Sequence, residues 1–185
     1  MLDDLLLKIQ ASDVFPNLRS VVVAGHSAGG QFVTNYEMTN RLHEQLRIPP
    51  TYVTANASVY AYPDDERPVS VTTRGCPTFA NWPFGLSART GYAARPSADE
   101  IVQQAARRSV TYLVGELDTQ PLEGGFYGSC AGRAQGATRF ARGVAFGKHM
   151  SERYKAGHAA IAVPGCAHSE GCMFLSRAGL GVLFP

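Results

Sequence analysis

The stretch Ser20–Gly30, which reads SVVVAGHSAGG, decides how this chain folds. Its first part, Ser20–Ala24, is a short, uninterrupted and mostly β-branched run, which is typical of a strand buried on both faces of a parallel sheet. Its second part, Gly25–Gly29, fits the pattern G-x-S-x-G, in which a serine stands on a sharp turn between a strand and a helix. Apolar residues then recur at helical spacing to about Leu46, and Pro49 blocks continuation.

The rest of the chain alternates between strand and helix patterns. Strands are predicted at Thr51–Ala55, Val110–Val114 and Ala159–Val163, and helices at 1–10, about 97–108, 137–155 and 173–180. Strands that alternate with helices form a parallel sheet between two helical layers, so the sequence predicts an α/β fold of three layers, α/β/α. A length of 185 residues corresponds to a single domain, 1–185.

Composition excludes several classes of protein. With 45% hydrophobic and 17% charged residues, the chain can bury a core and is not intrinsically disordered. Seventeen basic and fifteen acidic residues are scattered along it, so no nucleic-acid partner is expected. The longest apolar runs have the length of a strand, so no membrane span is expected. The acidic front and short apolar core of Met1–Lys8 do not fit a secretory signal, which predicts a cytoplasmic protein for the chain as written.

Ser27, at the centre of the G-x-S-x-G pattern, is the candidate nucleophile. We expect Gly25 and Gly29 to be required beside it, because only residues without a side chain let the backbone turn so sharply. Ser27 would project from the carboxyl end of its strand, where the helix dipole and the N–H of Ala28 favour an oxyanion. The alternative is a chance turn that joins a strand to a helix.

A serine nucleophile needs a histidine to take its proton and a carboxylate to orient that histidine. Glu116 and Asp118 both follow the third predicted strand, and we choose Asp118 because it lies deeper in the turn. His168 follows the fourth predicted strand in the same way and is the candidate base. The histidines that fit less well are His26, whose side chain we expect to turn away from the serine, His43, His149 and His158.

The four cysteines allow three pairing schemes if all are oxidised: Cys76, Cys130, Cys166 and Cys172. One expectation is a disulfide between loops from Cys76 to Cys130, and the other is free thiols in a reducing cytosol. Cys166 and Cys172 flank His168, but the C-x2-C spacing and the second ligand pair of a zinc site are missing. No metal site is therefore predicted, and the cysteine pairing stays open.

Three segments together resemble the α/β-hydrolase superfamily: Gly25–Gly30, Gly115–Thr119 and Pro164–His168. The turn AGHSAGGQ, residues 24–31, is similar to that of a poorly characterised subgroup, as are the segments Asp65–Pro68 and Ala134–Arg139. The resemblance covers essentially the whole chain and implies a serine hydrolase. It says little about the substrate.

The resemblance also implies that the chain is part of a larger fold. The complete family fold has eight strands and its nucleophile follows the fifth, whereas here the nucleophile follows the first predicted strand. We therefore expect the C-terminal half of an α/β-hydrolase fold, truncated at its N-terminus and lacking the loop that gives a second oxyanion N–H. The open edge of Val21–Ala24 would then favour a homodimer. The stretch 58–96 is expected to form a lid-like insertion whose aromatic rings either line an acyl pocket or pack against the body: Tyr60, Tyr62, Trp82, Phe84 and Tyr92.

Two functions follow from these expectations. The first is a serine hydrolase that cleaves a small carboxylic ester, or an amide, through an acyl-enzyme, with Ser27, His168 and Asp118 as its triad and no metal or organic cofactor. The second is a catalytically silent remnant that keeps the triad and serves as a binding or assembly module. Acyl transfer to an alcohol would use the same triad and differ only in how well the pocket excludes water.

Overall fold

The computed structural model describes residues 2–11, 13, 15–70, 72 and 74–185. The elements follow one another as α1 (Leu2–Ala11), β1 (Val22–His26), α2 (Ala28–Thr39), the 3-10 turn η1 (His43–Gln45), β2 (Thr51–Ala55), the 3-10 turn η2 (Gly91–Ala94), α3 (Ala98–Arg107), β3 (Val110–Gly115), α4 (Cys130–Ala134), α5 (Arg139–Tyr154), β4 (His158–Val163), α6 (Glu170–Leu175) and α7 (Arg177–Leu183). Met1, which the first predicted helix includes, lies outside the described residues.

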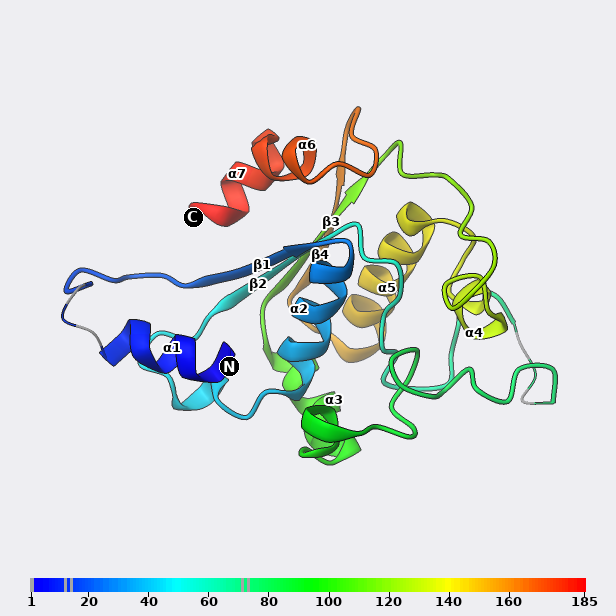
Figure 1. Ribbon diagram of the computed structural model, residues 1–185, viewed down its shortest axis with the longest axis horizontal. Helices are drawn as coiled ribbons and strands as arrows, with labels where there is room; N and C mark the ends of the chain where they lie inside the picture. The colour runs from blue at the N-terminus through cyan, green and yellow to red at the C-terminus, as the bar shows by residue number, and fades with distance from the viewer. Residues whose placement is uncertain (1, 12, 14, 71, 73) are drawn as a thin grey trace.

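A parallel sheet of four strands forms the centre of the molecule, in the order β1-β2-β3-β4 (Figure 1). Because all four strands run in one direction, their carboxyl ends meet at one edge of the sheet. The two inner strands, β2 and β3, are almost completely buried, whereas β1 and β4 are partly exposed. The predicted α/β fold is therefore confirmed.

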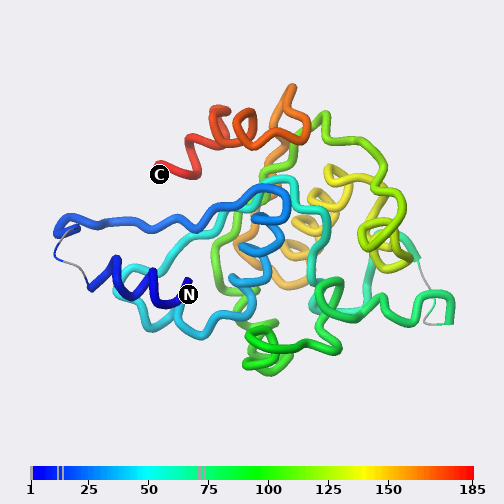
Figure 2. Tube along the Cα trace, in the orientation of Figure 1, coloured from blue at the N-terminus to red at the C-terminus, as the bar shows by residue number. Residues whose placement is uncertain are grey.

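Helices cover both faces of this sheet, so that α1 and α7 lie on opposite sides (Figure 2). Tyr52 and Tyr112 face a core shared with α1, α2, α3 and α5. Val53 and Leu113, the next residues in the same strands, face α6 and α7. This alternation gives the three predicted layers. Within the described ranges, no helix is long and apolar enough to cross a membrane.

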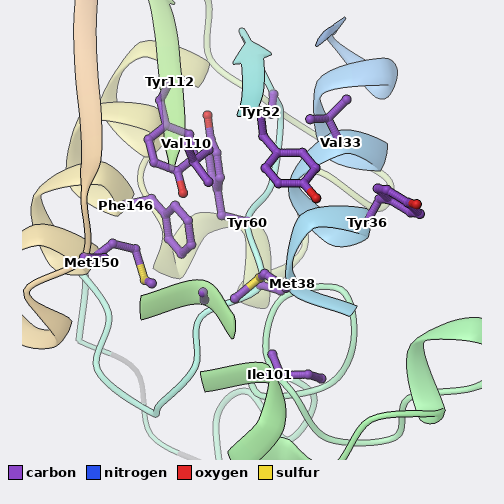
Figure 3. Packing of buried hydrophobic residues seen from close by; sticks show 14 of the residues in the cluster. Val33, Tyr36, Met38, Tyr52, Tyr60, Ile101, Val110, Tyr112, Phe146 and Met150 are labelled. Carbon is purple, nitrogen blue, oxygen red and sulfur yellow. The ribbon is translucent and has the colours of Figure 1, made fainter. Parts of the chain in front are cut away.

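Aromatic rings fill the core between the sheet and helices α1, α2, α3 and α5 (Figure 3). Phe146 of α5 stacks on Tyr60 with ring centroids 4.7 Å apart, and it meets Tyr112 edge-on at 5.5 Å. Tyr62 also packs edge-on against Phe146, at 4.9 Å. Tyr60 and Tyr62 therefore belong to the core that joins the insertion to the body, which is one of the two roles considered for its aromatic residues.

Strand β1 differs from the prediction in its position and its burial. It runs from Val22 to His26, two residues later than predicted, so the strand continues up to the serine turn. Val22 and Val23 are half-buried and Ala24 is exposed, although the apolar run indicated burial on both faces. The reason is that β1 pairs with β2 alone among the described strands and lies at the edge of the sheet.

Two helix boundaries also differ from the prediction. Helix α2 ends at Thr39 and not near Leu46, because the side-chain amide of Asn40 donates to two carbonyls of its last turn. The predicted last helix is divided into α6 and α7, because the Ser176 hydroxyl accepts from a backbone N–H and begins a second helix there. The short helix α4, within the stretch 118–136, was not predicted.

The stretch 58–96 connects β2 to α3 and is joined to α4. A disulfide links Cys76 to Cys130, the first residue of α4, and Phe79 and Phe84 pack in a small core beside it. Residues 71 and 73 of this stretch lie outside the described part of the chain. Its role as a lid stays a prediction.

Candidate active site

Ser27 lies on the turn between β1 and α2. Its φ of 54° and ψ of −117° form a conformation that residues with a side chain rarely adopt, at a cost of about 1–3 kcal/mol. The N–H of Ser27 donates to the carbonyl oxygen of Ala55 at 2.9 Å, which ties the turn to the end of β2. The turn therefore holds the serine at the carboxyl edge of the sheet.

Gly25 and Gly30 allow this turn, whereas Gly25 and Gly29 were expected to do so. A Cβ at Gly25 would lie 2.3 Å from the carbonyl oxygen of Gly29, and a Cβ at Gly30 would lie 2.9 Å from that of Ala55. A Cβ at Gly29 would meet nothing within 4 Å. The prediction was therefore right for Gly25 and wrong for Gly29, because the first turn of α2 approaches β2 at Gly30.

His168 joins Ser27 and Asp118 in one chain of hydrogen bonds. Its Nε2 lies 3.0 Å from Ser27 Oγ, and its Nδ1 lies 2.7 Å from Asp118 Oδ2. The three residues follow β1, β3 and β4, so three strand ends supply one group each. The side chain of His168 is 34% exposed, while that of Asp118 is 2% exposed. This is the geometry in which an imidazole can take a proton from a serine while a buried carboxylate orients it.

The hydroxyl of Ser27 is not used to cap the helix. Ser27 is the N-cap of α2, where a serine usually accepts a hydrogen bond from a backbone N–H, yet its side chain makes no capping bond. Ala28 is the first residue of α2, and the first N–H groups of a helix have no partner within it. These N–H groups and the helix dipole favour a negative charge beside the serine. The role of Ala28 as an oxyanion donor stays a prediction.

Asp118, and not Glu116, is the carboxylate that contacts the imidazole, since Glu116 is exposed to solvent. Arg139 places its Nη1 3.6 Å from Asp118 Oδ1 and donates from Nε to the Ser58 hydroxyl at 2.9 Å. This ion pair offsets part of the cost of burying the carboxylate. The sequence contained one signal for Arg139, the family-like segment 134–139, but no role was predicted for it.

His26 contacts the candidate base, whereas we expected its side chain to turn away. Its ring centroid lies 4.6 Å from that of His168, and Phe174 of α6 meets it edge-on at 6.5 Å. The cause is the extension of β1 through His26, which directs this side chain to the face that α6 covers. Burial lowers the pKa of His26, and the neighbouring imidazole lowers it further, which favours the neutral form of this ring.

The other three histidines have partners away from Ser27, Asp118 and His168. The bonds are His43 Nδ1 to Tyr52 Oη at 3.0 Å, His158 Nδ1 to Tyr112 Oη at 2.7 Å, and His149 Nε2 to Asp64 Oδ2 at 3.1 Å. Burial lowers the pKa of His158 to about 4. These contacts give the three histidines structural roles, in keeping with their poorer fit to the candidate base.

All four cysteines are paired. The bond from Cys76 to Cys130 was one of the two expectations, and Cys166 pairs with Cys172 across six residues. The second disulfide closes the loop that carries His168, so its cysteines cannot act as zinc ligands. Disulfides persist mainly in oxidising compartments. The cytoplasmic location stays a prediction.

One group of side chains has the composition of a metal site. Ligand atoms of Asp64, Glu66 and His149 lie within 4.8 Å of one another. Arg153 already pairs with both carboxylates, at 3.0 and 3.2 Å, and the Tyr154 hydroxyl donates to Asp64 at 2.6 Å. The group is therefore a polar junction between the insertion and α5.

A cavity of about 420 Å³ lies between α1, α2 and the end of the insertion. Its aromatic wall is formed by Phe32, Tyr36, Trp82 and Tyr92. The hydroxyls of Tyr36 and Tyr92 both donate to the carboxylate of Asp3 in α1. Trp82 and Tyr92 thus line a cavity, but no member of the triad is among the residues that line it.

Comparison with solved structures finds the same fold in proteins that include the following two. Poly(aspartic acid) hydrolase-1 from Sphingomonas sp. KT-1 has a TM-score of 0.68 and 22% identity, over 100% of this chain and 61% of its own. A poly(3-hydroxybutyrate) depolymerase from Bordetella parapertussis has a TM-score of 0.65 and 23% identity, over 98% of this chain and 59% of its own. No protein-family model and no curated protein sequence matches the chain. The chain spans about 60% of the length of these two structures, and over that span it has their fold.

Proposed function

We propose that this chain is a serine hydrolase of the α/β-hydrolase type that cleaves a carboxylic ester. One observation carries the proposal: the Ser27 hydroxyl, the His168 imidazole and the Asp118 carboxylate form a continuous chain, with contacts of 3.0 and 2.7 Å. The strained turn at Ser27 adds weight, because backbone strain of this kind is concentrated at functional sites.

In the proposed reaction, Ser27 Oγ attacks the ester carbonyl carbon while its proton passes to His168 Nε2. The carbonyl oxygen becomes an oxyanion beside the N–H of Ala28. His168 then gives the proton to the departing alkoxide as the C–O bond breaks, which leaves an acyl group on Ser27. Water repeats the sequence, releases the acid and restores the serine. Asp118 orients the imidazole through Nδ1 and stabilises its charged form.

The names of the two structural neighbours support hydrolysis of a carbonyl linkage. One is a poly(aspartic acid) hydrolase and the other a poly(3-hydroxybutyrate) depolymerase, so one polymer is joined by amides and the other by esters. An ester is the first choice here because its leaving group departs more readily than an amine. An amide is the second choice.

A second candidate function is a catalytically silent module that binds or assembles. One observation favours it: among the described residues, β1 pairs with one strand only. The hydrolase proposal also assigns a single oxyanion donor, Ala28. An open apolar edge favours pairing with a second copy. Loss of one oxyanion donor lowers the rate by about 10²- to 10³-fold.

Hydrolysis of p-nitrophenyl butyrate by the purified chain separates the two candidates. We expect turnover that Ser27→Ala and His168→Ala each reduce by at least about 10³-fold, whereas Ser151→Ala on the far helix α5 leaves it unchanged. No turnover by a chain that circular dichroism shows to be folded would reject the hydrolase. A dimer in light scattering would then support the assembly module.

A further inference from the structure

We infer that Asn56 positions His168 for catalysis by holding the loop that carries it, an inference that rests on the proposed function. Asn56 follows the last residue of β2, the strand that supplies no member of the triad. The residue is 1% exposed and its φ is 48°, a left-handed conformation that asparagine tolerates better than most residues.

The side chain of Asn56 bonds to the two loops that hold the base and the carboxylate. Its Nδ2 donates to the carbonyl oxygen of Ala167 at 3.0 Å, directly before His168. Its Oδ1 accepts from the N–H of Gly115 at 2.8 Å, at the end of β3 and three residues before Asp118. One amide thus uses both its donor and its acceptor to fix the distance between these loops.

The backbone beside Asn56 completes the connection to the serine. The carbonyl oxygen of Ala55 accepts from the N–H of Ser27 at 2.9 Å, and the N–H of Asn56 donates to the carbonyl oxygen of Leu113 at 3.0 Å. The end of β2 therefore contacts the segments that carry all three members of the triad. Asparagine offers both a donor and an acceptor on a short side chain and tolerates the left-handed backbone.

The position of the imidazole depends on this bond because it ties Ala167, the residue beside His168, to the end of β2, whereas the Cys166–Cys172 disulfide closes the loop on itself. The Cys166 carbonyl accepts from the Leu117 N–H at 2.9 Å, and the ring of His26 lies against that of His168. A displacement of about 1 Å at a reacting group costs about 10²-fold in rate. Losing the bond to Ala167 should therefore slow the chemical step while leaving substrate binding unchanged.

Asn56→Asp and Asn56→Gly test the inference in complementary ways. Aspartate keeps the acceptor for Gly115 but loses the donor, and glycine removes both bonds while suiting the positive φ. We expect both to lower kcat for p-nitrophenyl butyrate by about 10- to 100-fold with KM within about 2-fold. The matched control is Asn40→Asp, since Asn40 is equally buried and hydrogen-bonded but lies at the other end of α2. It should lower the unfolding temperature without a comparable loss of kcat.

A second readout does not depend on turnover. The hydrogen bond from His168 Nδ1 to Asp118 should give a strongly deshielded proton resonance, which we expect in the unmodified chain and in Asn40→Asp but weakened or lost in both Asn56 variants. Folded Asn56 variants with unchanged kcat, or with the resonance intact, would overturn the inference. If the unmodified chain shows the resonance but no turnover, the proposed function fails, and the resonance of the variants alone decides the role of Asn56.

Discussion

Replacing Glu37 by glutamine should stabilise the folded chain at neutral pH. Glu37 lies in α2 with its side chain fully buried, and neither carboxylate oxygen has a hydrogen-bond partner among the described residues. The guanidinium of Arg108 is directed to Glu44 at 2.8 Å and to backbone carbonyls. Burial raises the pKa of Glu37 to about 8, Glu44 adds to the effect and Arg108 opposes it.

The size of this stabilisation follows from the difference between the pKa of the Glu37 carboxyl in the folded and in the unfolded state. The unfolded carboxyl has its ordinary pKa of about 4.5, so between pH 4.5 and 8 the folded state binds more protons and its stability falls as the pH rises. A pKa difference of one corresponds to about 1.4 kcal/mol. Keeping the buried carboxyl protonated at pH 7 therefore destabilises the folded state by about 3 kcal/mol. Glutamine has the shape of the protonated acid and no such cost. The variant should gain about 3 kcal/mol, or about 6–12 °C in Tm, at pH 7.

Urea unfolding at pH 4.5, 6, 7 and 8 measures this effect. We expect the two chains to have nearly equal free energies of unfolding at pH 4.5 and to diverge steadily above it. Glu152→Gln is the control, because Glu152 is 67% exposed and pairs with the exposed Lys148 at 3.9 Å, so its removal should change stability little at any pH. A difference between Glu37→Gln and the unmodified chain that is absent at pH 7, or that is independent of pH, would refute the reasoning.

Two further predictions concern the triad and the disulfides. Asp118→Asn should lower kcat for p-nitrophenyl butyrate by about 10³- to 10⁴-fold, because the amide favours the wrong imidazole tautomer; an activity within 10-fold of the unmodified chain, with an unchanged circular dichroism spectrum, would contradict this. Replacing Cys76 and Cys130 together by alanine should cost about 4 kcal/mol in urea unfolding, and replacing Cys166 and Cys172 about 2 kcal/mol, since the first bond closes the longer loop. The second pair should lower kcat more than the first, because only that bond closes the loop of the candidate base, and the reverse order would count against its role there.

The serine turn could be predicted from the sequence because everything that forms it is contiguous. The β-branched run, Gly25, Ser27 and the helical spacing after Gly30 are local signals, and the structure has a strand, a turn and a helix there. Asp118 and His168 were predicted by the same logic, since parallel strands end at one edge and groups that follow them come together. The close approach at Gly30 depends on the neighbouring strand β2, which no local pattern describes.

The supporting residues could not be predicted in the same way, because their partners are distant in the chain. Asn56 donates to a carbonyl 111 residues away, and Arg139 donates to a hydroxyl 81 residues away. Both contacts depend on the strand order, which alternation of strands and helices does not specify. The missing strand order also explains why the burial of β1 was predicted wrongly. The apolar run correctly indicated a strand, but it could not show that this strand lies at the edge of the sheet.

Labelling with a fluorophosphonate probe, followed by intact mass and peptide mapping, tests the central claim most directly. The account predicts one adduct per folded chain on Ser27, abolished in Ser27→Ala and strongly slowed in His168→Ala. A folded chain that forms no adduct, or one whose adduct persists in Ser27→Ala, would contradict the claim that Ser27 is an activated nucleophile.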